Sequence, residues 1–333
     1  MDQQRTSMDD GRELKSEAVP TAAFNRIERS SDLKISVIIP AFNAERYIAK
    51  AIESCLSQTY APHEIIVIDD ASTDGTAAIA ESFPAPVRVI RLTENNGVSV
   101  ARNRGVAAST GDWIAFLDAD DWFLPDKLEL QRRCALENPK AVLIYTGYRM
   151  IGINGSESCG RFFSPRELWP RLRYRDDINL SSVLLHRDAF DAVGGFDPAF
   201  HIAQDWDLWL RLAARYSVKM FAAVPEPLVV YRRVAGSLSS NAMRYYYDRV
   251  PIINSSCLLG TAGLSRFLWR LRISAFNYFD TSIALREEGS LLALPFILKS
   301  IALWPFPCDG MPLTRYKVAA VMIKQHLHRR LSK

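Results

Sequence analysis

Short runs rich in β-branched residues alternate with helical stretches from residue 35 onward, and this alternation constrains the fold more than any other feature of the chain. The strand-like runs lie at residues 35–39, 64–69, 87–91, 113–117, 141–145, 180–186 and 219–231. The clearest helical patterns between them lie at residues 48–56, 72–82, 98–108, 125–138 and 205–216. Such alternation predicts an α/β fold with a mostly parallel mixed sheet flanked by helices.

The composition is that of a globular protein large enough to bury a sizeable core. Of 333 residues, 48% are hydrophobic and 23% are charged, which excludes a disordered or collagen-like chain. The five cysteines are scattered singly and match neither a disulfide framework nor a zinc motif. Residues 1–33 are polar and contain no apolar segment typical of a signal peptide, so we expect a disordered tail and a cytoplasmic protein.

Three motifs that could form a ligand site lie where three of the predicted strands end. They are Pro40-Ala41-Phe42, Asp69-Asp70 and Asp118-Ala119-Asp120-Asp121. Ligands of open α/β sheets bind at the carboxyl ends of strands, so neighbouring strands would bring these motifs to one crevice. Clustered carboxylates need a counter-charge, and Mg²⁺ or Mn²⁺ typically bridges them to substrate phosphates. For Asp69 and Asp74, capping of the following helix is an equally good explanation.

Several nucleotide-binding and phosphate-handling classes lack their motif here. Neither G-x-G-x-x-G nor G-x-x-x-x-G-K-[ST] follows the first predicted strand, which argues against dinucleotide dehydrogenases and P-loop enzymes. A nucleotidyltransferase acting on sugar phosphates would show a glycine-rich loop with a lysine at the same place. A haloacid-type phosphatase needs D-x-D-x-[TV], whereas the sequence after Asp121 continues with Trp122.

Several motifs together make the chain resemble the family 2 glycosyltransferases, which are inverting enzymes of the GT-A fold with nucleotide-sugar donors. The matching sequence segments are SVIIPAFNAERYI, EIIVIDDASTDGT, ENNGVSVARNRGVAASTGDWIAFLDADD, GGFDPAF and QDWDLWLRLA. These motifs occur in the family's order and span roughly residues 34–240.

The resemblance implies a donor site with a divalent cation as cofactor. It assigns Pro40, Phe42 and Asp70 to the site of a uridine-type base and its ribose. It makes Asp118-Ala119-Asp120 the D-x-D motif, with Asp120 as the principal metal ligand and Asp118 near the ribose or the metal. Arg102 would approach the diphosphate of the donor.

The resemblance also implies an acceptor site at residues 204–206. Asp205 corresponds to the catalytic base, which removes a proton from the acceptor hydroxyl. Gln204 stands where the family usually carries Glu, and Trp206 is expected on the acceptor side. Without the resemblance, Asp205 could equally be a negative charge that stabilises a helix N-terminus. Asp207 can pair with Arg211 one turn later, so we interpret it as structural.

The C-terminal region is basic and partly apolar. Residues 241–333 contain 13 Lys and Arg against 5 Asp and Glu, a net +8, whereas residues 1–240 carry a net −4. Residues 291–306 are apolar apart from Lys299 and Ser300, and the segment is too short to span a bilayer. A helical stripe of Tyr316, Ala320, Ile323, Leu327 and Leu331 follows. This region either packs on the protein's own core or contacts an anionic membrane, and no pattern favours nucleic acid.

The sequence therefore predicts a metal-dependent inverting glycosyltransferase with a UDP-sugar donor and a saccharide acceptor, which we expect to be lipid-linked or a growing surface polysaccharide. The expected organisation is a tail at 1–33, a donor-binding half at 34–138, an acceptor-binding half at 139–240 and a helical region at 241–333. That region could hold the protein on the inner face of the plasma membrane. A non-catalytic nucleotide-sugar-binding protein is the alternative.

Overall fold

The computed structural model describes residues 32–234, 241–306 and 314–331, so most of the predicted tail lies outside the described residues. The first half of the chain contains β1 (Ile35–Ala41), α1 (Ile48–Leu56), β2 (Glu64–Asp69), α2 (Thr76–Glu81), β3 (Val87–Arg91), α3 (Val98–Ala108), β4 (Trp113–Phe116), β5 (Trp122–Phe123) and α4 (Lys127–Glu137). It continues with β6 (Leu143–Ile151), β7 (Glu157–Cys159), α5 (Pro165–Arg171), the 3-10 helix η2 (Leu180–Ser182), β8 (Val183–His186), α6 (Arg187–Ala192), α7 (Gln204–Arg215) and β9 (Phe221–Arg232). The C-terminal region holds α8 (Ala242–Asn254), α9 (Gly263–Glu287), α10 (Ala293–Leu303) and α11 (Thr314–Leu331).

The strands form one mixed sheet, as predicted, in the order β3-β2-β1-β4-β8-β6-β9-β5, with β7 paired to β6. Strands β3, β2, β1 and β4 are mutually parallel, and β6 and β9 are parallel to each other. Strand β8 is antiparallel to both of its neighbours, β4 and β6. The chain order reverses direction between β1 and β4, and such a switch point is where open α/β sheets bind ligands.

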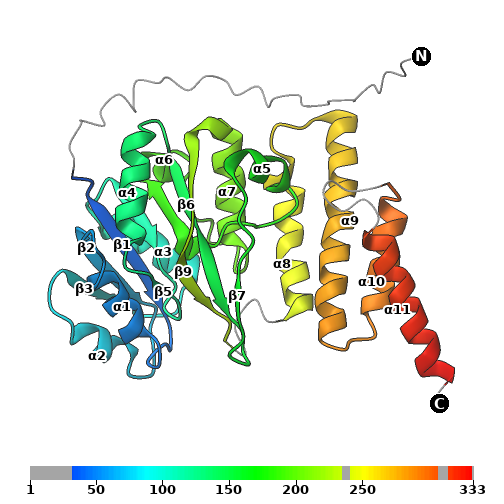
Figure 1. Cartoon of the computed structure of the whole chain (residues 1–333), viewed down its shortest axis with the longest axis horizontal. Helices are drawn as coiled ribbons and strands as arrows, with labels where there is room; N and C mark the ends of the chain where they lie inside the picture. The colour runs from blue at the N-terminus through cyan, green and yellow to red at the C-terminus, as the bar shows by residue number, and fades with distance from the viewer. Residues whose placement is uncertain (1–31, 235–240, 307–313, 332–333) are drawn as a thin grey trace.

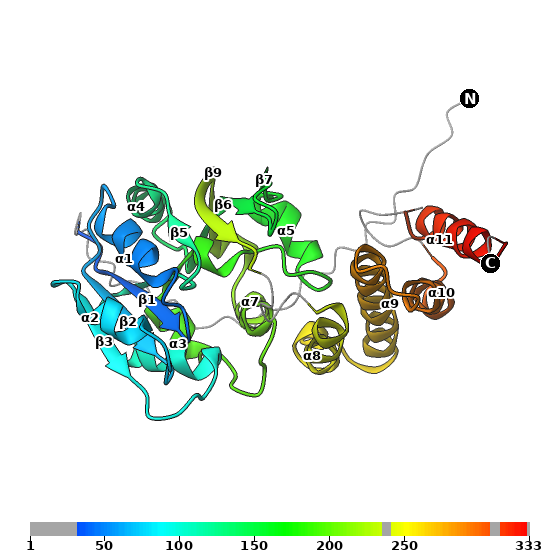
Figure 2. The same ribbon diagram turned by 90° about the horizontal axis from the view of Figure 1, so that it is seen from below.

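Helices cover both faces of the sheet, because alternate residues of each strand point to opposite sides. On β1, Val37 and Ile39 pack with α1 and α4, whereas Ile38 packs with α3. Helices α6 and α7 also belong to the second face. Figure 1 and Figure 2 show α8, α9, α10 and α11 as a row of helices beside the sheet. The core of the second face continues into this row.

The C-terminal region packs in part on the protein's own core. Helix α10 packs against α9 through Ile297 and Ser300, so part of the apolar segment is core. On α11 the buried side chains are Arg315, Ala319 and Met322. Of the predicted stripe, Tyr316, Ala320 and Ile323 are exposed, so the alternative of packing on the core is wrong at these positions, and the side chains of Leu327 and Leu331 lie outside those that the structure describes. None of the helices in the described residues is both long and apolar enough to cross a membrane.

Two local expectations are also corrected. Residues 72–75 precede α2 instead of beginning it, because Asn43, Ser72 and Asp74 tie the β1–α1 and β2–α2 loops to each other. Asn43 thus bonds to this loop, and α1 begins five residues later at Ile48. The predicted strand at 180–186 is shorter, since its first three residues form η2.

Candidate active site

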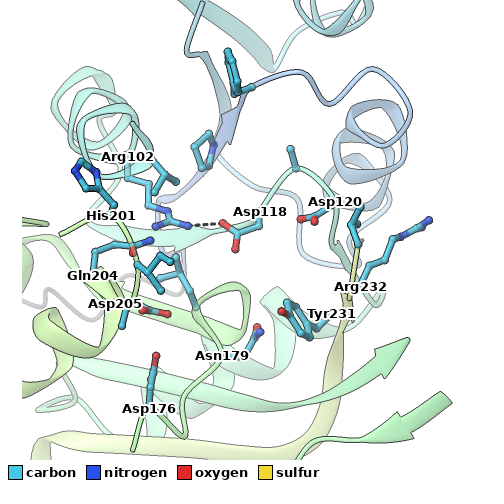
Figure 3. A pocket seen from close by; sticks show the side chains of 18 of the residues that line it. Arg102, Asp118, Asp120, Asp176, Asn179, His201, Gln204, Asp205, Tyr231 and Arg232 are labelled. Carbon is cyan, nitrogen blue, oxygen red and sulfur yellow. Dashed lines mark hydrogen bonds and ion pairs between the residues drawn. The ribbon is translucent and has the colours of Figure 1, made fainter. Parts of the chain in front are cut away.

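A cavity of about 640 Å³ lies at the carboxyl ends of β1 and β4 (Figure 3). The two strands are parallel neighbours, so the residues that follow them meet at this edge of the sheet, as the sequence predicted. Pro40 and Phe42 come from the end of β1, and Asp118 and Asp120 come from the loop after β4. The volume lies within the range typical of small-molecule sites.

The acidic loop after β4 presents two of its aspartates to the cavity and uses the third to fix its own shape. Asp118 and Asp120 line the cavity, whereas Asp121 is buried. The Asp121 carboxyl accepts hydrogen bonds from Ser181 Oγ at 2.7 Å and from the Arg232 backbone N–H at 2.9 Å. Ser181 Oγ in turn accepts from the Asp118 backbone N–H at 3.2 Å. Asp121 and Ser181 therefore hold the loop against η2 and β9.

Negative charge is concentrated at Asp120. Burial and the neighbouring Asp118 raise the pKa of Asp120 to about 6, and the positive charge of Arg232 offsets this effect only in part. A divalent cation fits this place. No group of three or more His, Cys, Asp or Glu side chains in the described residues could complete its coordination. Mg²⁺ and Mn²⁺ sites of one or two carboxylates are typically completed by water and substrate phosphates.

Arg102 of α3 supplies positive charge beside the acidic loop. Its side chain is 3% exposed and donates to Asp118 Oδ1 at 2.6 Å. Its Nε and one of its Nη atoms are buried and have no hydrogen-bond partner in the described structure. Unpaired guanidinium donors in a cavity are costly unless a ligand accepts from them, and phosphate oxygens suit them well.

The opposite side of the cavity is formed by the first turn of α7. Ala203 adopts a left-handed backbone (φ 58°), which is uncommon outside glycine, and the helix begins at the next residue. Gln204 is buried, and its Oε1 accepts no hydrogen bond in the described structure. Asp205 Oδ1 accepts from the Trp206 backbone N–H at 2.9 Å. Burial raises the pKa of Asp205 above its usual value, while Arg102 acts in the opposite direction.

Comparison with known families decides the class of protein. The model of "Glycosyl transferase family 2" matches residues 36–193, and that of "Glycosyltransferase like family 2" matches residues 173–261. The chain is 33% identical over 213 residues to TuaG of Bacillus subtilis, described as a teichuronic acid biosynthesis glycosyltransferase, covering 62% of this chain and 82% of TuaG. The chain belongs to glycosyl transferase family 2. It is therefore an enzyme, and the expected family is confirmed.

Other relatives and solved structures agree with this assignment. An Escherichia coli β-1,3-glucosyltransferase, WfgD, named for UDP-Glc and GlcNAc-diphosphoundecaprenol, is 30% identical over 217 residues, which cover 64% of this glycosyltransferase and 82% of WfgD. The structure of Staphylococcus aureus TarS 1–349 with UDP-GlcNAc superposes with a TM-score of 0.58 at 20% identity, over 81% of this chain and 84% of that one. The likeness confirms the expected GT-A fold.

Seven of the residues predicted for the site line the cavity of this glycosyltransferase: Pro40, Phe42, Arg102, Asp118, Asp120, Gln204 and Asp205. Asp70 and Trp206 are not among the lining residues. The Asp70 carboxylate accepts from the backbone N–H groups of Asn96 and Gly97, both at 2.9 Å, and so shapes the loop before α3. The Trp206 ring is completely buried, and its Nε1 donates to the Leu172 carbonyl at 2.6 Å. Asp70 and Trp206 therefore stabilise segments that surround the cavity, and their side chains do not face into it.

The interpretation of Asp207 as structural is confirmed. Its carboxylate accepts from Arg211 Nε at 2.8 Å, one turn later on α7, and also from the Ser256 hydroxyl. Arg211 donates further to the Gly195 carbonyl at 2.7 Å. This network joins α7 to the loop before it and to the C-terminal region, and thereby fixes the helix that carries Asp205.

Sequence reasoning missed part of the cavity wall. The missed residues include Tyr47, Tyr148, Asp176, Asp177, Asn179, His201, Tyr231, Arg232 and Tyr245. Asp176 and Asp177 stand between α5 and η2, where the sequence shows no periodicity. The adjacent pair of acidic residues in RDDIN was the available signal. Tyr245 comes from α8, so the C-terminal helical region contributes to the site.

Proposed function

We propose that this glycosyltransferase moves a sugar from a nucleoside diphosphate donor, a UDP-sugar, onto a hydroxyl group of a saccharide, with inversion at the anomeric carbon and with a divalent cation. One observation carries the proposal. A single cavity places Asp118, Asp120 and Arg102, which suit a cation and a diphosphate, on one side and Asp205 on the other. A donor sugar held between them would have its leaving group and its attacking nucleophile on opposite faces.

Asp205 is suited to act as the general base. An acceptor hydroxyl is a poor nucleophile, and a positioned carboxylate removes its proton as the new bond forms. The raised pKa of Asp205 makes its carboxylate a better proton acceptor than an exposed aspartate. The hydrogen bond from the Trp206 N–H holds Oδ1 of this carboxylate in place.

The donor side stabilises the departing diphosphate. Asp120, with Asp118 beside it, would hold the cation. The cation would neutralise the charge that develops on the phosphate oxygens. The two unpartnered nitrogen atoms of Arg102 would donate to the same phosphate group. Supporting this arrangement, a mannosyltransferase from Pyrobaculum calidifontis of the same fold, 18% identical with a TM-score of 0.51 over 90% of this chain and 82% of that one, was solved with GDP-Man and Mn²⁺.

We further propose that residues 34–138 form the donor-binding half and residues 139–240 the acceptor-binding half. Tyr245 of α8 extends the acceptor-binding half into the C-terminal region. The names of TuaG and WfgD support an acceptor on a surface polysaccharide or a polyprenyl diphosphate.

Catalysis can be tested by UDP release from UDP-glucose and UDP-N-acetylglucosamine, first with water as acceptor. The wild type is expected to release UDP only with Mg²⁺ or Mn²⁺, and Asp205→Asn is expected to lower the rate about 100-fold or more. Unchanged UDP affinity in the variant would show that its donor site is intact. Nuclear magnetic resonance of the first product tests inversion, because an α-linked donor should yield the β anomer. An undiminished rate in Asp205→Asn would contradict the role of Asp205 as base.

The surface of the C-terminal region supports association with a membrane, which we propose to occur on the cytoplasmic side. On the first turns of α9, Leu264, Phe267 and Leu268 are exposed, with Leu264 at 73%, and Arg266 and Arg270 are exposed among them. Apolar side chains interspersed with cations are typical of contact with an anionic bilayer.

Flotation with liposomes tests this part of the proposal. The full chain is expected to float with vesicles containing phosphatidylglycerol. With vesicles of pure phosphatidylcholine it is expected to remain at the bottom of the gradient. The double variant Leu264→Ser/Phe267→Ser is expected to lose flotation while keeping its UDP-release rate. Equal flotation of wild type and variant would contradict contact through α9.

A further inference from the structure

A second carboxyl group lies against the proposed catalytic base. Asp176, in the segment between α5 and η2, faces Asp205 of α7 within the cavity (Figure 3). The two carboxyl groups lie close enough to share a proton in a hydrogen bond, and the Ile178 backbone N–H lies beside the Asp176 carboxyl. Two carboxylates cannot hydrogen-bond to each other unless one of them carries a proton.

The surroundings determine which of the two holds the proton. Asp176 Oδ1 is shielded from solvent and receives no hydrogen bond from a donor group in the described structure. Burial and the adjacent Asp205 raise the pKa of Asp176 well above its usual value. Arg102 favours the ionised form of Asp205, and the shared hydrogen bond lowers the pKa of Asp205 while raising that of Asp176. These effects favour the proton on Asp176, whose carboxylic acid would then be the donor.

We propose that Asp176 is a positioning residue, which donates a hydrogen bond to the carboxylate of Asp205 and thereby orients it toward the acceptor hydroxyl. This inference rests on the proposed role of Asp205 as base. In the arrangement the Trp206 N–H and the Asp176 carboxyl both donate to Asp205. The aspartate is then held without being neutralised, as a general base requires.

The state of the pair depends on the other ionisable groups that face it. These are Asp177 on the same segment, Asp118 and Arg102 from the donor side, Tyr148 of β6, and Tyr245 of α8, against whose ring the Arg249 guanidinium lies at 5.1 Å. Asp177 is paired with Arg171 at 3.0 Å and with Arg175 at 3.5 Å. The remaining acidic groups disfavour a second negative charge on Asp176.

Infrared difference spectroscopy tests the protonation of Asp176 without any substrate. At pH 7.5 the spectrum of wild type minus Asp176→Asn is expected to show the C=O stretch of one protonated carboxylic acid. The matched control is Asp177→Asn, whose difference spectrum is expected to show a carboxylate band only, because Asp177 is ion-paired. A carboxylate band in place of the carboxylic acid band for Asp176→Asn would overturn the proposal.

The pH dependence of UDP release tests the positioning role. In the wild type, kcat should fall at low pH as Asp205 gains a proton, and fall again at high pH as Asp176 loses its own. Asp176→Asn keeps a donor but cannot ionise, so it should keep the acid limb and lose the alkaline limb. Asp176→Ala has no donor, so its kcat should fall about tenfold or more and its acid limb should shift to higher pH.

The outcomes separate this inference from the proposed function. If Asp205→Asn retains the wild-type rate, the role of Asp205 fails and the inference fails with it. If Asp205→Asn is inactive while Asp176→Asn and Asp176→Ala share the wild-type pH profile and kcat, only the inference is overturned. Measurement with Mg²⁺ at saturating UDP-sugar keeps donor binding out of the comparison.

Discussion

Arg102 and Asp118 form a short ion pair at the edge of the cavity, with Nη2 and Oδ1 separated by 2.6 Å. The guanidinium is almost fully buried, whereas the carboxylate is 34% exposed. Because the pair uses one nitrogen of Arg102 and leaves two buried nitrogens without a partner, it positions a cation for an anionic ligand. The pair also links α3 to the acidic loop after β4.

Replacement of Arg102 by Lys should separate phosphate recognition from base recognition. Lysine retains the charge but lacks the additional guanidinium donors. We expect Arg102→Lys to weaken the binding of UDP about tenfold or more, the effect of losing a hydrogen bond to a charged group. Uridine, which has no phosphate, serves as the matched ligand and should bind both proteins equally. Calorimetric titration measures both, and an equal loss for uridine would show that Arg102 only maintains the fold.

Ser181→Ala should loosen the acidic loop. The substitution removes the donor to Asp121 and the acceptor for the Asp118 N–H, so the free energy of unfolding should decrease by about 1–3 kcal/mol. The affinity for UDP with Mg²⁺ should decrease as well, because the carboxylates of Asp118 and Asp120 move with the loop. Ser182→Ala is the control, since the Ser182 hydroxyl donates to the Asn179 carbonyl and not to this loop. Equal UDP affinity in the two variants would argue against the loop's dependence on Ser181.

Lys127 should make stability increase with pH above neutrality. This lysine is completely buried, its Nζ donates to Gln131 Oε1 at 2.8 Å, and burial lowers its pKa to about 7. Between that value and the ordinary pKa, the unfolded chain binds a proton that the folded protein lacks. The contribution of Lys127 to stability is therefore lost as the pH falls toward 7, with a slope of up to about 1.4 kcal/mol per pH unit.

Urea unfolding of wild type and Lys127→Met between pH 7.5 and 9.5 measures this slope. The free energy of unfolding should rise more steeply with pH in the wild type than in the variant, which lacks the titrating amine. Parallel slopes in the two proteins would contradict a neutral Lys127.

The sequence was sufficient to predict the donor side of the site, and the reason lies in the topology. Residues after parallel neighbouring strands must meet at one edge of the sheet, so Pro40 and Asp118 could be brought together from strand patterns alone. Asp205 was expected because a family motif surrounds it. The structure confirms that these residues share a cavity, while their chemical roles stay predictions.

The acceptor wall and the C-terminal region could not be predicted in the same way. Asp176 lies in an irregular segment whose path is set by side chains such as Trp206, which bonds to the Leu172 carbonyl. Tyr245 reaches the cavity because Arg249, buried on the same helix, pairs with Asp280 of α9 at 3.0 Å. On α11, the buried Arg315 donates to the Trp304 carbonyl at 2.8 Å and turns the predicted apolar stripe outward. Such tertiary contacts override helical periodicity.

The most direct test of the account is calorimetric titration of UDP into wild type and Asp120→Asn, each with Mg²⁺, with Mn²⁺ or with EDTA. We predict that the wild type binds UDP with either cation and weakly or not at all with EDTA. Asp120→Asn should lose the cation-dependent part of the affinity while keeping the wild-type unfolding free energy within about 1 kcal/mol. Binding of equal strength with EDTA, or in the variant with Mg²⁺ or Mn²⁺, would contradict a cation-dependent donor site at Asp120.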